Sequence, residues 1–525
     1  KALWDTFHPP QLETLFKSWS RPDPFLLEAL KPERPVRTEQ FASEPGKLEV
    51  GFTDLHLAGR VRFSGLRSLR VAFYRGANSF GSEQVLLDAT SDPIEFEDAY
   101  RWQNRALDVR YEWVQSGRLL LNADAWLSDY ALRHPISDVA ETEEFNALRE
   151  AGVRVGGDVA LSARHSISTA VEVAHSESEF QISLDPSGSS PVGTEELQPI
   201  SWRMSTFAES RLGIMPSTTL EMGMRLTYVP VRQTVYAEPR LAVQYDMETD
   251  RGVWSARGAA GIYRQFVHSF DVATHTIVSL LPRVRFWLPV SEREHPPIAY
   301  HFAGALLYRP DRIWEFGIET YYKHQPHLLV LNYGAPRSDE LLTRAKGRAY
   351  GAAVTTARRG ERLQIEAQYE FALARRRVPN RFEGRDVAVP WSAPHQLVLE
   401  VDAVPVASIT LTLRGHAAFG RMWGFRQAYY DFLATDPASQ VFGSFDLTRP
   451  EDHRLPAFVR LDLGAAYSRR MAGVSIQGRL FLINVLGRRN VSDWSLRYDE
   501  GVHSYVRESR RGAPFMPVVS LGVNI

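Results

Sequence analysis

Alternation of apolar and polar side chains is the dominant pattern along this chain. It is clearest in residues 458–490, where Val459 and Leu463 belong to one set of alternate positions and Arg460 and Asp462 to the other. A β-strand sends successive side chains to opposite faces of its sheet. The pattern therefore predicts strands that have one apolar face and one charged face.

The same two-residue period recurs about twenty times after residue 47, in segments of about 9 to 16 residues. Strands of soluble proteins are shorter, with about five to six residues as the commonest length. Helical spacing fits none of the clearest segments, which are residues 105–115, 220–229, 314–322, 363–371 and 409–419.

The connections between these segments alternate between short and long. Short turns are expected at residues 66–68, 115–118, 310–312 and 469–473, and long connections at 76–100, 129–150, 264–297, 424–454 and 488–513. A Greek-key sandwich would mix the lengths at both ends. Strict alternation is typical of a membrane barrel, which has short periplasmic turns and long external loops.

We therefore expect an all-β, transmembrane, up-and-down antiparallel β-barrel of about 20–22 strands over residues 47–525. Residues 1–46 are rich in proline and are not strand-like, so we expect an N-terminal non-barrel segment there, either a plug remnant or a periplasmic arm. No window holds 18 consecutive apolar residues, which argues against transmembrane helices.

The free-energy cost of placing a charge in lipid indicates which face of the sheet meets the membrane and which meets the lumen. An Arg or Lys side chain on the lipid face costs about 2–4 kcal/mol at mid-bilayer, enough to empty that face of charge. The charged face should therefore line the lumen. The candidate lumen-lining residues are Glu221, Arg225, Glu315, Glu319, Glu366, Glu370, Arg414, His416, Arg460 and Asp462. Their charges could hold the wall together through cross-strand pairs or contact a substrate.

Composition excludes several classes of function. The formal net charge is −1, whereas a protein that binds nucleic acid usually carries a large excess of basic residues. The charge therefore argues against binding of DNA or RNA. The absence of cysteine excludes thiolate metal sites, thiol catalysis and disulfides. The common hydrolase, zinc-protease and nucleotide-binding motifs are missing as well. We expect no catalytic residue, metal or cofactor. An outer-membrane enzyme with His416 or His301 as general base is the least favoured hypothesis.

Several short motifs resemble the barrel of the TonB-dependent outer-membrane receptors, in the form common in Bacteroidetes-like bacteria. The segment RLDLGAAY, followed by LINVLGRRNV, is similar to the penultimate strands of that family, with Leu486 and Gly487 in place of a Phe and an Asn. Further matches fall at residues 236–245, 299–323, 347–351 and 390–401. The family has 22 barrel strands and a plug domain of over a hundred residues before them, for which residues 1–46 are too few.

The resemblance implies a protein of the cell outer membrane that takes up a bulky nutrient. A plugless barrel that acts as a passive pore or as a structural subunit of a larger assembly is the alternative. The implied partners are outer-membrane lipids and lipopolysaccharide, an unknown nutrient ligand and one of three proteins: a plug domain, TonB or a surface lipoprotein. Receptors of this family bind ligand with external loops, so the candidate ligand residues are His268, His275, Trp287, Trp391, Trp423 and Tyr429. Anchoring of the loops is the competing role for these aromatic residues.

Overall fold

The computed structural model describes most of the chain after residue 40. The described residues are 41–88, 94–137, 142–183, 194–197, 200–272, 284–292, 294–331, 342–379, 384–389, 392–423, 441–442, 445–446, 453–471, 474–499, 504–512 and 514–524. The first strand begins at Phe41, and most of the expected N-terminal segment, residues 1–40, lies outside the described residues.

The described residues form one large antiparallel sheet of 21 strands. Its first half contains β1 (Phe41–Ser64), β2 (Arg67–Asp88), β3 (Ile94–Ser116), β4 (Leu119–Ser137), β5 (Thr142–Ser162), β6 (His165–Ser183), the short β7 (Thr194–Leu197), β8 (Ile200–Met215), β9 (Thr218–Val229) and β10 (Thr234–Thr249). Its second half contains β11 (Gly252–Arg264), β14 (Ile298–Arg309), β15 (Trp314–Leu331), β16 (Leu342–Arg359), β17 (Leu363–Arg377), the short β18 (Val387–Ala388), β19 (His395–Val406), β20 (Ile409–Phe419), β23 (Phe458–Met471), β24 (Val474–Ile483) and β27 (Met516–Asn524).

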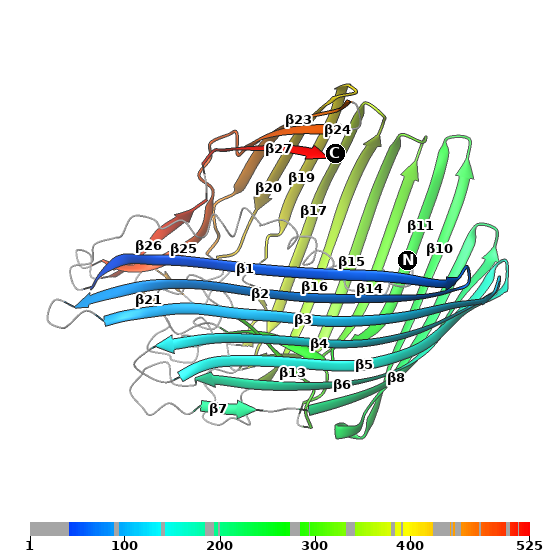
Figure 1. Ribbon diagram of the computed structural model, residues 1–525, viewed down its shortest axis with the longest axis horizontal. Helices are drawn as coiled ribbons and strands as arrows, with labels where there is room; N and C mark the ends of the chain where they lie inside the picture. Colours follow the sequence, from blue (N-terminus) through cyan, green and yellow to red (C-terminus); the bar gives the residue numbers. More distant parts are fainter. Residues whose placement is uncertain are drawn as a thin grey trace.

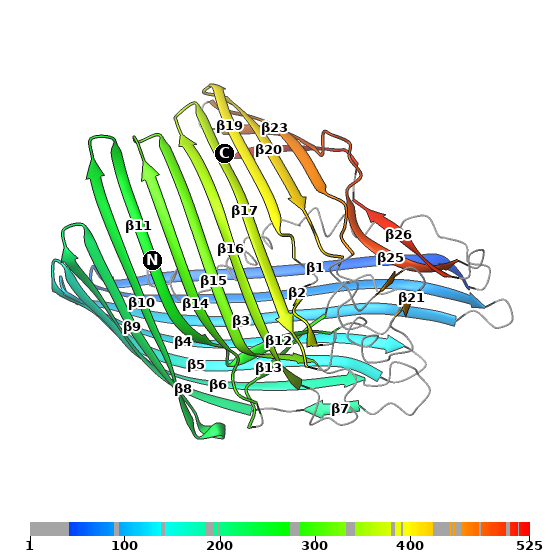
Figure 2. The same ribbon diagram turned by 180° about the vertical axis from the view of Figure 1, so that it is seen from behind.

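Each long strand pairs with the next long strand along the chain, as in a meander. Three small hairpins interrupt the meander: β12–β13 (Val267–Val272 and Val284–Pro289), β21–β22 (Val441–Phe442 and Phe445–Asp446) and β25–β26 (Val491–Asp499 and Ser504–Arg511). The sheet curls, so that β1 to β6 lie across from β14 to β19 (Figures 1 and 2). The predicted all-β, up-and-down antiparallel barrel is confirmed. Within the described ranges, β1 pairs only with β2 and β27 only with β24.

Short and long connections alternate between the two ends of the sheet. The turns 65–66, 117–118, 163–164 and 407–408 are two residues long, whereas the segments 265–297, 420–457 and 484–515 connect strands at the other end. Two long connections expected from the sequence are wrong. Residues 76–100 and 129–150 are mostly strand, because β2 to β5 extend far beyond the other strands at this end.

The two faces of the sheet differ as the alternation predicts. On β9, the apolar side chains of Met222, Met224 and Leu226 are exposed on one face, while Glu221 and Arg225 lie on the other. An exposed apolar row of this kind recurs on the neighbouring strands. Since strand side chains alternate strictly, the sequence period alone sets this division. No helix among the described residues is long and apolar enough to span a membrane.

Two asparagines at the end of β24 explain the LINVLGRRNV motif. Asn484 adopts a left-handed backbone (φ 55°), which asparagine tolerates better than most residues, and it begins the turn that ends β24. Asn490 is buried and pairs with both main-chain groups of Val459: its Oδ1 accepts from the amide at 2.9 Å and its Nδ2 donates to the carbonyl at 2.9 Å. The side chain thereby continues the sheet past the end of β24.

Replacement of Asn490 by alanine should destabilise this end of the sheet. The substitution leaves the two main-chain groups of Val459 without their partners in a half-buried position, which costs up to about 1–3 kcal/mol per group. We expect a lower midpoint of thermal unfolding in detergent, followed by the gel shift between folded and heat-denatured protein. The exposed neighbour Arg489→Ala is the control, and equal midpoints for the two variants would contradict this role.

Candidate functional site

The hairpin β12–β13 folds into the space enclosed by the curled sheet. It belongs to the connection between β11 and β14, yet β13 contacts β5 and β6, and β12 contacts β15 (Figure 2). Its base is closed by main-chain hydrogen bonds from Gln265 to Pro297 and from Val290 to Phe266. The polar face of β5 and β6 is the face that the hairpin meets, which identifies this face as the inner one.

One asparagine holds the hairpin to the opposite wall. Asn146 of β5 accepts from the Trp287 amide at 2.7 Å and donates to the Trp287 carbonyl at 3.0 Å. Ser178 of β6 donates to the same carbonyl at 2.8 Å. Asn146 and Ser178 are buried, so these bonds form away from water. Buried main-chain groups need partners, and here two wall side chains supply them.

An aromatic contact also joins the hairpin to the wall. Phe286 of β13 packs edge to face on Phe180 of β6, with ring centroids 5.0 Å apart, and both rings are almost completely buried. Such a pair contributes about 0.5–1.5 kcal/mol beyond the burial of its area. The described part of the hairpin is therefore a packed element of the interior.

The segment after the hairpin is fixed by an arginine of the neighbouring connection. Arg232, in the short 3-10 helix η1 (Pro230–Arg232), donates to the main-chain carbonyls of Ser291 and Glu292 and lies 3.2 Å from the His295 ring nitrogen. Burial lowers the pKa of His295, and nearby arginines lower it further. At this end of the interior, Arg232 consequently carries a positive charge, and the neighbouring His295 is neutral.

His268 of β12 is the most deeply buried of the candidate ligand residues on the hairpin. Burial lowers the pKa of His268 to about 4, and the charge of nearby His327 on β15 adds to this shift. Its imidazole is therefore neutral near pH 7. Trp287 is half-buried, and its main chain carries the contacts to the wall. The main chain of Trp287 thus fixes the hairpin to the wall, and His268 is buried within it.

Trp423, the third candidate within the described residues, anchors two other connections. It is buried, its indole Nε1 donates to the Trp494 carbonyl at 3.0 Å, and its ring meets those of His453 and Trp494 edge to face. His275, Trp391 and Tyr429 lie outside the described residues. Of the three candidates within the described residues, His268 and Trp287 belong to the hairpin and Trp423 to another connection.

The ten predicted lumen residues all lie on the polar face, and six of them form ion pairs among the described residues. Glu221 pairs with Arg257 at 2.9 Å, Arg225 with Glu172 at 2.8 Å, Glu315 with Arg309 at 2.7 Å, Arg414 with Glu400 at 2.8 Å, and Arg460 with Asp462 at 2.9 Å. Glu366 lies opposite Glu400, Glu370 opposite Gln396 and Glu319 opposite Ala353 and Ala305. His416 packs its ring near Phe458, at 5.2 Å.

A polar contact that spans three strands of the wall is centred on Asp124 of β4. Its carboxylate accepts from Arg110 of β3 at 2.5 Å and from Arg154 of β5 at 2.7 Å, and it is 5% exposed. Charge-assisted bonds of this kind are about twice as strong as neutral ones. They join three consecutive strands. Among the described residues there is no group of three His, Cys, Asp or Glu side chains that could hold a metal ion.

Sequence reasoning missed the residues that dock the hairpin. Asn146 falls in a stretch predicted to be a long connection, and Ser178 is one of several serines on its strand. A lone Asn or Ser carries no motif. The usable signal was in the connection itself, since VHSFDV and VRFWLP have the β-branched and aromatic composition of strands.

Comparisons with known proteins agree on the fold. No protein-family model matches the sequence, and no curated protein matches it. Solved structures do match. The unliganded ferric citrate transporter FecA superposes with a TM-score of 0.57 at 12% identity, over 92% of this chain and 77% of that one.

Two further structures match equally well. The ferric-catecholate import receptor Fiu from Escherichia coli K12 has a TM-score of 0.56 at 10% identity, over 93% of this chain and 82% of that one. The copper transporter OprC has a TM-score of 0.55 at 11% identity, over 94% and 82%. At these identities the similarity establishes a shared barrel fold.

Replacement of Asn146 by alanine should release the hairpin from the wall, because both main-chain groups of Trp287 lose a partner. The chain has no cysteine, so spin labels can be attached to cysteines introduced at Ser269 and Ser128. Electron paramagnetic resonance should give a narrow distance distribution in the parent protein and a broad one in the variant. Asn122→Ala, on the inner face of β4, is the control; a narrow distribution in Asn146→Ala would refute the docking role.

Docking of the hairpin should also depend on pH. The buried His268 stays neutral down to about pH 4, whereas an undocked histidine takes up a proton below about pH 6.5. Docking is therefore strongest above pH 6.5 and weakens as the pH falls toward 4. We expect the label distances to broaden between pH 7.5 and pH 4.5. His268→Gln should remove this response, and an unchanged response in that variant would assign it to other groups.

Proposed function

We propose that this chain is the barrel of an outer-membrane receptor of the TonB-dependent type, of the kind common in Bacteroidetes-like bacteria, and that it imports a bulky nutrient. The hairpin docked inside the barrel carries the proposal most directly, because it narrows a wide cylinder from the side of the long connections. A path obstructed in this way suits the controlled passage of one large ligand better than free diffusion of many small ones. The meander of strands, the shared barrel fold and the motifs around Asn484 support the same assignment.

In this proposal the barrel lies in the cell outer membrane and begins with β1 at Phe41, and the residues before β1 are a periplasmic arm or part of a plug. The inner charged residues line a wet lumen, where most of them brace the wall through ion pairs. Glu319, Glu366 and Glu370, for which no ion pair with a described residue is present, are the ones left to meet a plug or a ligand. The plug, TonB or a surface lipoprotein would be the protein partners.

The proteins of similar fold suggest which cargo to test, since they are described as a ferric citrate transporter, a ferric-catecholate import receptor and a copper transporter. A chelated metal is therefore the first cargo to test. The arginine Arg232 near the long-connection end of the barrel suits an anionic chelate. The alternatives are a passive pore or a structural subunit, and uptake kinetics distinguish these from a receptor.

The test compares the source bacterium with a strain that lacks this protein. Both are grown in medium containing radioactive iron citrate, and the depletion of all other solutes is followed by mass spectrometry. We expect the loss of uptake of one bulky solute, and the parent strain should lose the same uptake when a protonophore collapses the inner-membrane gradient. Slower, protonophore-insensitive uptake of many small solutes would instead establish a pore. Unchanged uptake of every solute would leave a structural role.

A further inference from the structure

Arginines gather on the outer face of β2 to β5, around the middle of these long strands. One cross-strand row runs from Arg75 through Arg105, Asp129 and Arg149 to Glu177. Four residues further along β3 and β4, Arg101 lies opposite Arg133. These positions share the face of the exposed apolar residues Val71, Leu127 and Val153, not the polar face.

The arrangement places like charges side by side. Arg75 and Arg105 are directly opposite each other on adjacent strands, and so are Arg101 and Arg133. Like charges in directly opposite positions destabilise a sheet. Asp129 pairs with Arg149 at 3.3 Å, and among the described side chains neither Arg75 nor Arg105 forms an ion pair. An anion bound at this row would relieve the repulsion.

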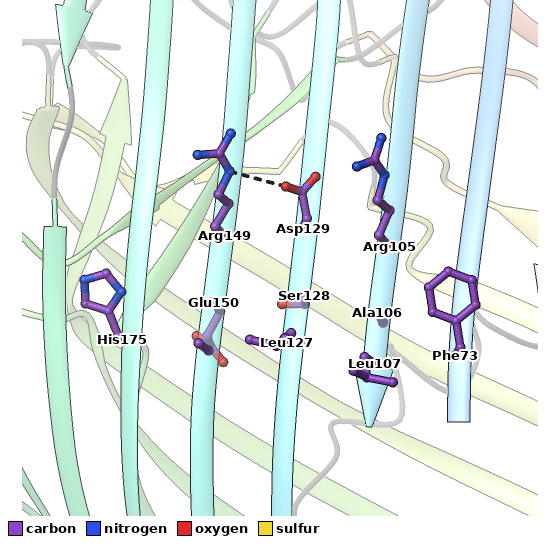
Figure 3. Close-up of a pocket in the computed structure, with 11 residues that line it drawn as sticks. Phe73, Arg105, Ala106, Leu107, Leu127, Ser128, Asp129, Arg149, Glu150 and His175 are labelled. Carbon is purple, nitrogen blue, oxygen red and sulfur yellow. Dashed lines mark hydrogen bonds and ion pairs between the residues drawn. The ribbon is translucent and has the colours of Figure 1, made fainter. Parts of the chain in front are cut away.

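An apolar hollow lies directly beneath the arginine row. Its floor is the next outward-facing row, made by Phe73, Leu107, Leu127, Ala151 and His175, and Figure 3 shows Arg105, Asp129 and Arg149 lined up along its upper edge. The cavity measures about 290 Å³. It exists because the small side chain of Ala151 stands between the larger Leu127 and His175.

The height of the row matches the edge of a membrane. Arg105 lies eleven residues from the end of β3 at Ser116, which is about 28 Å of height at a rise of about 3.3 Å per residue and a strand tilt of about 40°. The apolar band of a membrane barrel is about 25 Å tall. Between Arg105 and the turn, the outward positions of β3 are Leu107, Val109, Tyr111 and Trp113, none of them charged.

We propose that this surface binds a phosphorylated, acylated lipid of the outer leaflet, with the phosphate at Arg75, Arg105 and Arg149 and an acyl chain in the hollow beneath them. The guanidinium fork suits phosphate because it donates two parallel hydrogen bonds. A cationic rim above an apolar groove at the level of the headgroups is complementary to a lipid in both charge and polarity. The inference rests on the outer-membrane placement proposed above and not on transport.

The experiment measures binding of lipid A to the full chain, purified and delipidated in non-ionic detergent, by native mass spectrometry. Bisphosphorylated lipid A should bind at least tenfold more tightly than the same lipid without phosphates. The variant Arg105→Gln/Arg149→Gln should lose that tenfold preference. Arg469→Gln, which removes an outer-face arginine at the short-turn end of β23, should keep it. The gel shift on heating verifies that each variant is folded.

A second variant tests the acyl groove. Ala151→Leu fills the hollow without changing charge, so it should weaken lipid A binding while leaving any binding of inorganic phosphate unaltered. Equal binding of phosphorylated and dephosphorylated lipid A would overturn the proposal, and so would displacement of lipid A by millimolar inorganic phosphate. Membrane fractionation of the cells separates this failure from a failure of the proposed function, since a protein outside the outer membrane would refute both.

Discussion

Pairing of the main chain is the constraint on which the rest of the structure depends. In hydrocarbon no water is present to satisfy an N–H or C=O group, so each strand must bond along its whole length to its neighbours. The ladder meets this requirement between consecutive long strands from β1 to β27, and within the described ranges only the outer edges of β1 and β27 have no partner strand. Once the backbone is committed to long antiparallel strands, the two-residue period directs alternate side chains inward, and ionised groups can be tolerated only there. The Asp124 contact with Arg110 and Arg154 is a direct product of this geometry.

The same requirement governs the interior hairpin. β12 and β13 bond to each other, and the edge of β13 that approaches the wall would bury main-chain groups with no strand to receive them. Asn146 and Ser178 replace the missing strand with side-chain donors and acceptors. Asn490 performs the equivalent task for Val459 where β24 has already ended. In both places an amide side chain, which offers N–H donors and a carbonyl acceptor as a peptide group does, extends a ladder that the backbone leaves incomplete.

The sequence predicted the sheet well because its information is local. The two-residue period assigns Val459 and Leu463 to one face of the sheet and Arg460 and Asp462 to the other. The alternation of short and long connections predicts the up-and-down order of the strands. The docking of the hairpin was not predictable in this way, since Asn146 and Trp287 are 141 residues apart and neither belongs to a pattern. The extent of β2 to β5 was also missed. Beyond the membrane both faces of a strand meet polar surroundings, so alternation fades although pairing continues, as it does between Asp129 and Arg149.

The bonds between Asn146 and residue 287 engage only main-chain atoms of the hairpin. Every amino acid except proline has the amide hydrogen and carbonyl that this attachment uses. The half-buried side chain of Trp287 can consequently vary over evolution without loss of this attachment, whereas the buried Phe286, which packs on Phe180, cannot. Substitution of Trp287 could thus change the surface inside the barrel while the hairpin keeps its place on the wall.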